Sequence, residues 1–257
     1  MATYSLKKSY QLKNLKEINF KDLWGDHGVF TTMWIFGKPV KILFFENHLK
    51  NLIKSLKSYG INKKSLKKDI IEIINNNLSK NIRYNHLLRI ALNKKIISIS
   101  LRKRIPPKIN FNLRLVNLKR EKPQFKNLKY KKILKHLSKI DNSKSDIGLV
   151  HNKKILETGT SNLLFIKNEN VFTPKKDYYE GNTYKYFKTK IKKIKKKNIL
   201  IKELNQYDEI ILIGSGKGVA SVKTINQIGW KRKSLNKYKL FSKYYKTAIK
   251  QSASYRF

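Results

Sequence analysis

Acidic residues are rare in this chain, so the position of each one is informative. Lysine and arginine together number 59, against 16 aspartates and glutamates. Glu157 heads a small polar cluster, T-G-T-S-N, and Lys126 lies in the segment P-Q-F-K-N-L-K-Y. Two polar turns that contain glycine follow, E-G-N-T at 180–183 and G-S-G-K-G at 214–218. A carboxylate can pair with a protonated ring nitrogen, a lysine can form an imine, and turn amides can bind a phosphate.

Taken singly, each of these features has a simpler explanation. A lone acid before a strand is usually a solvated turn residue, and a glycine-rich stretch is usually an ordinary turn. Their combination is more specific, because a ring-facing carboxylate, an imine-forming lysine and a phosphate cradle are together what a protein must supply to pyridoxal phosphate. The sequence therefore predicts pyridoxal 5'-phosphate as a cofactor.

The chain resembles the class IV, or fold-type IV, family of pyridoxal-phosphate enzymes, which includes branched-chain and D-amino-acid aminotransferases and 4-amino-4-deoxychorismate lyase. The likeness runs in order through nearly the whole chain. It rests on these segments: G-D-H-G-V-F at 25–30, F-F-E-N-H-L at 44–49, P-Q-F-K-N-L-K-Y at 123–130, E-T-G-T-S-N-L-L-F at 157–165 with the later F-T-P and E-G-N-T, and G-S-G-K-G-V-A-S-V-K-T-I at 214–225.

The resemblance implies a role for each of the matched residues. Lys126 would form the Schiff base with the cofactor and move protons, and Glu157 would pair with the pyridine nitrogen. The phosphate would be held by Asn182, Thr183, Ser215 and Gly216. Tyr130 stands in the place of the family's tyrosine, and the substrate would contact Phe30 and Thr32. The family also implies a homodimer with small-molecule pockets completed across its interface.

The chain departs from the family pattern at several positions. Asn51 replaces an arginine, and a neutral amide cannot give the bidentate phosphate contact of a guanidinium. Lys50 would supply a point charge in its stead. The further replacements are Tyr184 for an arginine, Ser221 for a proline and His27 for a glycine. These departures bear chiefly on cofactor affinity.

Two reactions of the family compete for this chain. The segment F-T-T at 30–32 and the short chain of 257 residues favour the lyase, which releases pyruvate and forms 4-aminobenzoate for folate synthesis. The alternative is a branched-chain or D-amino-acid aminotransferase. Both reactions pass through the same carbanion, so the choice lies with pocket residues that the sequence does not identify.

The formal net charge of +43 suggests a second alternative, a non-catalytic basic protein that binds nucleic acid on a dead enzyme scaffold. The lysines, however, are spread along the whole chain, with one dense patch at 189–202 and no accompanying nucleic-acid motif. Asparagine and isoleucine are also in excess, which favours a bias toward A- and T-rich codons. Nucleic-acid binding beyond non-specific charge is therefore not expected.

Other classes of site are excluded by composition. The chain has no cysteine, so it has neither disulfides nor thiolate metal ligands, and its five histidines lack metal-ligand spacing. His48 is interpreted as a packing residue on a helix face. No run of eighteen or more apolar residues occurs, so a cytoplasmic protein without a membrane span is expected.

Hydrophobic spacing predicts a mixed α/β (α+β) chain of two domains, 1–118 and 119–257, and the family resemblance implies that the cofactor lies between them. Period-two patterns predict strands at 4–12, 84–93, 94–103, 109–118, 145–152, 162–168, 170–173 and 208–214, and a hairpin of 29–36 with 40–45. Helical spacing predicts helices at 47–60, 65–78 with Ser65 as N-cap, 128–140, the segment after Asn182 that carries the lysine patch, and 237–251.

Overall fold

The computed structural model describes residues 3–257, which form two compact units. The first unit contains the described residues up to Arg104 together with Phe125–Lys131 and Gln251–Phe257. The second unit contains Ile105–Gln124 and Lys132–Lys250. The predicted boundary near residue 118 falls inside the segment 105–124, which belongs to the second unit.

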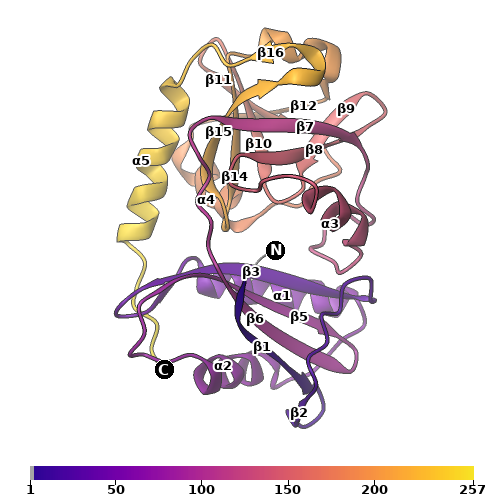
Figure 1. Ribbon diagram of the computed structural model, residues 1–257, viewed down its shortest axis with the longest axis vertical. Helices are drawn as coiled ribbons and strands as arrows, with labels where there is room; N and C mark the ends of the chain where they lie inside the picture. The colour runs from indigo at the N-terminus through magenta and orange to yellow at the C-terminus, as the bar shows by residue number, and fades with distance from the viewer. Residues whose placement is uncertain (1–2) are drawn as a thin grey trace. The chain divides into compact units, whose positions relative to one another are not determined.

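The first unit is an antiparallel sheet with two helices (Figure 1). Its strand order is β2-β1-β6-β5-β3-β4. The elements are β1 (Tyr4–Gln11), β2 (Glu17–Ile18), β3 (Gly28–Gly37), β4 (Lys41–Ile42), α1 (Phe45–Ser58), α2 (Leu66–Asn77), β5 (Tyr84–Asn93) and β6 (Ile96–Lys103). One face of the sheet is buried. Alternate residues of β3, among them Val29, Met33 and Ile35, pack against the apolar sides of α1 and α2.

The apolar stripe that helical spacing predicts in the sequence forms the buried face of α1. Leu49, Leu52 and Leu56 are each at most 2% exposed. The helix ends before Gly60, which has a φ of +68° that other residues rarely adopt. Ser65 stands at the N-cap of α2 as predicted, but its hydroxyl donates to Asp69 and does not cap the backbone.

A short segment completes the edge of β3 that β4 leaves uncovered. Val29 forms an isolated bridge with Asn127, flanked by hydrogen bonds from the Phe30 N–H to the Lys126 carbonyl (2.8 Å) and from the Leu128 N–H to the Gly28 carbonyl (2.9 Å). Residue 28 must be glycine, because a Cβ there would lie 2.1 Å from the Leu92 carbonyl oxygen. Lys126 is thus fixed to β3 through its backbone.

The second unit is built on a sheet of order β12-β11-β10-β14-β15-β7-β8-β9-β13, with β16 beside β15. Its strands are β7 (Phe111–Asn117), β8 (Ser145–His151), β9 (Lys154–Thr158), β10 (Asn162–Lys167), β11 (Asn170–Pro174), β12 (Ile194–Lys197), β13 (Ile199–Leu200), β14 (Glu209–Gly214), β15 (Gly218–Ile225) and β16 (Trp230–Lys231). Its helices are α3 (Lys131–Leu137), α4 (Asn182–Lys190), α5 (Asn236–Lys250) and the 3₁₀ turns η1 (Ile201–Gln206) and η2 (Asn226–Ile228). The core lies among β7, β10, β14 and β15, with Phe111, Phe165 and Trp230 almost fully buried.

Three sequence expectations about elements are wrong. The helix predicted at 128–140 spans only Lys131–Leu137, because residues 126–128 pair with β3. The lysine patch does not continue the helix after Asn182, since α4 ends at Lys190 and the lysines that follow include the exposed edge strand β12. The strand β9, which contains Glu157, was not predicted, because the segment between the strands 145–152 and 162–168 reads as a turn.

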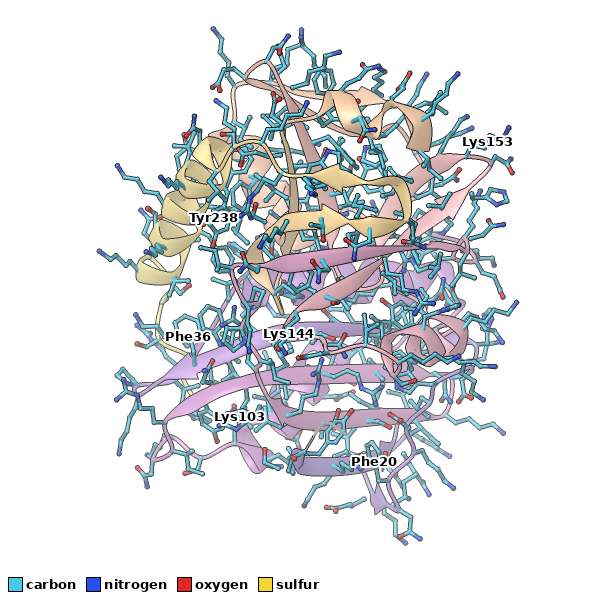
Figure 2. All side chains as sticks on the ribbon, turned by 45° about the horizontal axis from the view of Figure 1, so that its top comes forward. Phe20, Phe36, Lys103, Lys144, Lys153 and Tyr238 are labelled. Atoms are coloured by element: carbon cyan, nitrogen blue, oxygen red, sulfur yellow. The ribbon has the colours of Figure 1, made fainter. Side chains whose placement is uncertain are left out.

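Lysine side chains project outward over both units (Figure 2), and Lys153 stands at the end of the β8–β9 hairpin. Within residues 3–257, no helix has both the length and the apolarity needed to cross a bilayer.

Candidate active site

The predicted Schiff-base lysine lies against an aromatic wall in the first unit. The Lys126 ammonium is 5.1 Å from the centroid of the Phe30 ring. Phe30 in turn meets Tyr130 edge-on at 5.5 Å and Trp24 at 4.7 Å, and Trp24 stacks on Tyr130. We call Trp24, Phe30, Lys126 and Tyr130 the lysine cluster. Three of its members were singled out from the sequence, and the structure brings them together.

The other face of β3 holds a buried histidine beside the same lysine. Thr31 Oγ1 lies 2.7 Å from His48 Nδ1, and His48 is 4% exposed. Burial and, to a smaller extent, the positive charge of Lys126 together lower the pKa of His48 to about 3. His48 is therefore neutral at physiological pH, in agreement with its interpretation as a packing residue.

A buried arginine extends the face of the sheet that carries Phe30. Arg89 on β5 stands opposite Thr32 on β3 and opposite Ser100 on β6, so the three side chains share one face. Its guanidinium lies 4.4 Å from the Trp24 ring, and its Nη2 bonds to Asp22. Its Nε and Nη1 are buried, as is Ser100 Oγ, and none of these atoms has a hydrogen-bond partner within the described part of the chain.

The predicted ring carboxylate lies in the second unit, in a buried ion pair. Arg120 Nε donates to Glu157 Oε1 at 2.6 Å and Arg120 Nη2 to Oε2 at 3.3 Å, while the Tyr179 N–H also reaches Oε2 at 3.3 Å. Arg120 is anchored further by the Pro123 carbonyl at 2.8 Å. Burial raises the pKa of Tyr179 to about 12, so its hydroxyl stays protonated. We call Arg120, Glu157 and Tyr179 the carboxylate cluster.

The predicted phosphate residues occupy two places in the second unit. Asn182 and Thr183 lie in the first turn of α4. The backbone N–H groups of a first turn have no acceptor within the helix, and the helix dipole favours an anion there. The Thr183 hydroxyl is buried and has no hydrogen-bond partner among residues 3–257. Ser215 and Gly216 lie half-buried in the β14–β15 loop.

The Asn162 side chain links these elements to the strand that follows Glu157. Its Nδ2 donates to the Tyr179 carbonyl, and its Oδ1 accepts the Gly181 N–H at 3.1 Å. The start of α4 is therefore fixed to β10 by a side chain of the T-G-T-S-N cluster. Asn51, the residue in place of the family's arginine, lies half-buried on α1 in the first unit.

Sequence reasoning missed Arg120 and Arg89. The scarcity of arginine in this lysine-rich chain is visible in the sequence, but the burial that distinguishes these two arginines is visible only in the structure. A guanidinium keeps several donors in a fixed plane, so an arginine retained against a lysine-rich background indicates bidentate bonding. Trp24 and Tyr179 were also missed, and no spacing rule would have selected them.

Comparison with known proteins identifies the family and the fold. Residues 28–225 match the family described as amino-transferase class IV. A search of curated proteins gave no match. Among solved structures, a branched-chain aminotransferase from Thermoproteus uzoniensis has a TM-score of 0.74 at 14% identity, over 95% of this chain and 93% of the other.

Two further structures show the same fold. A hypothetical aminotransferase from Mycobacterium tuberculosis in its PLP-bound form has a TM-score of 0.72 at 15% identity, over 95% of this chain and 99% of the other. A putative branched-chain amino acid aminotransferase from Thermotoga maritima has a TM-score of 0.76 at 13% identity, over 95% and 96%. The fold-type IV architecture expected from the sequence is confirmed. The chain belongs to the class IV aminotransferase family, a family of pyridoxal-phosphate-dependent enzymes.

Proposed function

We propose that this protein is a pyridoxal-phosphate-dependent aminotransferase that moves an amino group between an amino acid with an apolar side chain and a 2-oxo acid. The observation that carries this proposal is the family match over 28–225, which includes Lys126, Glu157, the start of α4 and the β14–β15 loop. The solved relatives named above are aminotransferases, so we favour this reaction over the lyase that the sequence alone suggested.

The residues present fit the cofactor. The buried Thr183 hydroxyl at the N-terminus of α4 lacks a protein partner within the described residues, and a phosphate oxygen would supply one. Glu157 is a buried carboxylate that accepts from Arg120 and from the Tyr179 N–H, and it is the group that would accept a ring N–H. Arg120 holds that carboxylate in place.

When bound, pyridoxal phosphate supplies an electron-accepting ring that carries the substrate's amino group. The side chains of this protein would supply the rest. Lys126 would accept the proton from the substrate's α-carbon and then donate it at another atom. To accept that proton, the Lys126 ammonium must first become a neutral amine. Glu157 would hold the proton on the ring nitrogen, and Trp24, Phe30 and Tyr130 would exclude water from the reacting carbon.

Arg89 would bind a carboxylate of the substrate. Its Nε and Nη1 are donors on different edges of the planar guanidinium, and Ser100 lies directly opposite on β6. These two nitrogens and the Ser100 hydroxyl are buried and lack partners among the described residues, a costly arrangement that an incoming carboxylate would relieve in part. Thr32 lies opposite Arg89 on β3, and this supports a place for its side chain near the substrate.

The test is spectroscopic and then kinetic. The purified protein with added pyridoxal phosphate should show a near-ultraviolet to visible absorption band that Lys126→Ala removes. Lys129→Ala is the matched control, because Lys129 lies in the same segment and its ammonium bonds the Gly25 carbonyl. A colourless wild type, or a Lys126→Ala variant that keeps the band, would overturn the assignment of Lys126.

Substrate choice is settled by turnover. Leucine, valine and isoleucine with 2-oxoglutarate should react, and loss of Arg89 as Arg89→Met should raise KM more than it lowers kcat. Turnover of aminodeoxychorismate to pyruvate would instead select the lyase, which the F-T-T segment at 30–32 favours. D-amino acids form the third arm. The homodimer implied by the family resemblance is checked on the same sample by light scattering.

A further inference from the structure

A second carboxylate, Asp146, is completely buried near the start of β8. Its Oδ2 accepts the hydroxyls of Thr158 at 3.0 Å and Thr160 at 2.6 Å, and its Oδ1 accepts the Ile147 N–H at 2.8 Å. Residue 159 can only be glycine in this turn, because a Cβ there would lie 2.8 Å from an Ile147 side-chain carbon. The turn that follows Glu157 is therefore wrapped around Asp146.

Lys217 brings a buried positive charge to the same carboxylate. Its ammonium lies 3.7 Å from Asp146 Oδ2, donates to the Asn142 carbonyl at 3.2 Å and lies 4.7 Å from the centroid of the Phe111 ring. The side chain of Lys217 is 9% exposed and that of Asp146 is 0% exposed. Removing the ammonium would leave the Asp146 carboxylate buried without this counter-charge.

This ion pair joins the β14–β15 loop, which the phosphate assignment needs, to the end of β9. Lys217 belongs to that loop with Ser215 and Gly216, whereas Thr158 ends β9 and Thr160 lies in the turn that follows. The same two segments approach closely at a second point, since a Cβ on Gly214 would lie 3.0 Å from Ser161 Oγ. The next residue, Asn162, then fixes the start of α4.

We propose that the Asp146–Lys217 pair is a positioning device for the phosphate end of the cofactor site. A loop that contains glycines at 214, 216 and 218 has high conformational freedom, and a buried ion pair fixes it before the ligand arrives. The pair itself does not contact the substrate or the reacting atoms. This inference rests on the proposed function, because it assigns the loop to a phosphate.

The test compares ligands with and without the phosphate. Apoproteins of the wild type, Asp146→Asn and Lys217→Met are titrated with pyridoxal phosphate and with pyridoxal, and backbone hydrogen exchange is followed at 158–161 and 214–218. We expect the Kd for pyridoxal phosphate to rise roughly tenfold in both variants, while the Kd for pyridoxal changes less than about twofold. Exchange should accelerate in both segments together, and the double variant should bind about as weakly as either single variant.

Two controls separate positioning from general destabilisation. Glu209→Gln alters another buried carboxylate of the second unit, one that bonds backbone N–H groups of α5, and should leave the preference for the phosphorylated ligand unchanged. Thr160→Val removes a single hydroxyl from an exposed residue and remains informative if Asp146→Asn fails to fold. It should weaken pyridoxal phosphate binding about threefold.

Each remaining outcome has a clear meaning. If the variants lose affinity for both ligands equally, or loosen only one of the two segments, the positioning role is wrong while the proposed function stands. If the wild-type apoprotein binds neither ligand, the proposed function fails and this inference fails with it. A wild type that binds both ligands equally well also overturns the inference, because the loop then does not hold a phosphate.

Discussion

The imidazole of His48 makes the stability of the first unit depend on pH. Its pKa is lowered to about 3 by burial and by the charge of Lys126, whereas an unfolded histidine titrates near 6.5. Between pH 6.5 and pH 3, His48 therefore binds a proton in the unfolded chain and stays neutral in the folded chain. The free energy of unfolding should fall by about 1.4 kcal/mol for each pH unit between about 6 and 4, and this effect is absent above pH 6.5.

The variant His48→Gln should flatten this acid dependence. Glutamine keeps an acceptor for the Thr31 hydroxyl but has no proton to gain. Urea unfolding of wild type and variant at pH 4.5 and pH 7.5 measures the difference. The exposed His27 provides the control as His27→Gln, which should leave the slope unchanged. An equal slope in the wild type and in His48→Gln would show that another group dominates the acid limb.

At the same scale, the sequence was informative about residues whose chemistry is distinctive. Lys126 and Glu157 were selectable because motifs surround them and because acids are scarce. Arg89 and Arg120 were not selected, since their importance comes from burial, and burial depends on strand register between segments far apart in the chain. Asp146 was missed for the same reason: its partners lie 12, 14 and 71 residues away.

At the scale of elements, periodicity was sufficient where a segment packs on one face only. The spacing of Leu49, Leu52 and Leu56 gave α1. The strands β3 and β5 were found as apolar runs, since both are buried over most of their length. Periodicity failed where tertiary pairing overrides local preference. Residues 126–128 precede a predicted helix, but in the structure they pair with the open edge of β3. No local sequence pattern indicates this pairing.

The attachment of α5 to the second unit is a testable case of such long-range pairing. Glu209 on β14 is 1% exposed, and its two oxygens accept the N–H groups of Lys237 and Tyr238, each at 2.9 Å. These are first-turn amides of α5 that its own helix cannot satisfy. Glu209→Gln should lower the free energy of unfolding by about 2 kcal/mol, because an amide offers one acceptor in place of two and loses the charge.

Thermal or denaturant unfolding with hydrogen exchange on α5 measures this loss. Glu46→Gln is the matched control, since Glu46 is exposed and only pairs with Lys67 on the surface, so its loss should change stability by less than about 0.5 kcal/mol. Equal effects of the two substitutions would mean that α5 is held by its apolar contacts with β14 and β15 rather than by this cap.

At the scale of the whole molecule, the net charge of +43 predicts association with any polyanion. The charge is distributed: exposed lysines lie on β12 in the second unit and on the β8–β9 hairpin, and the first unit carries its own. A dedicated nucleic-acid site would concentrate the affinity in one place. A distributed charge gives binding that does not depend on the nucleotide sequence. Its affinity falls steeply as the salt concentration rises, because the release of counterions from the nucleic acid then becomes less favourable.

We therefore expect oligonucleotides of unrelated sequence to bind equally at low salt and to dissociate near physiological ionic strength. Two charge-matched variants locate the effect. Lys192→Gln with Lys193→Gln removes two charges next to β12, and Lys153→Gln with Lys154→Gln removes two from the β8–β9 hairpin. If charge alone acts, both variants lose the same small amount of affinity and show the same reduced salt slope in fluorescence titrations. A larger loss in the Lys192 and Lys193 variant, or a sequence preference that persists at about 0.15 M salt, would reveal a specific site at the β12 edge and restore the nucleic-acid alternative.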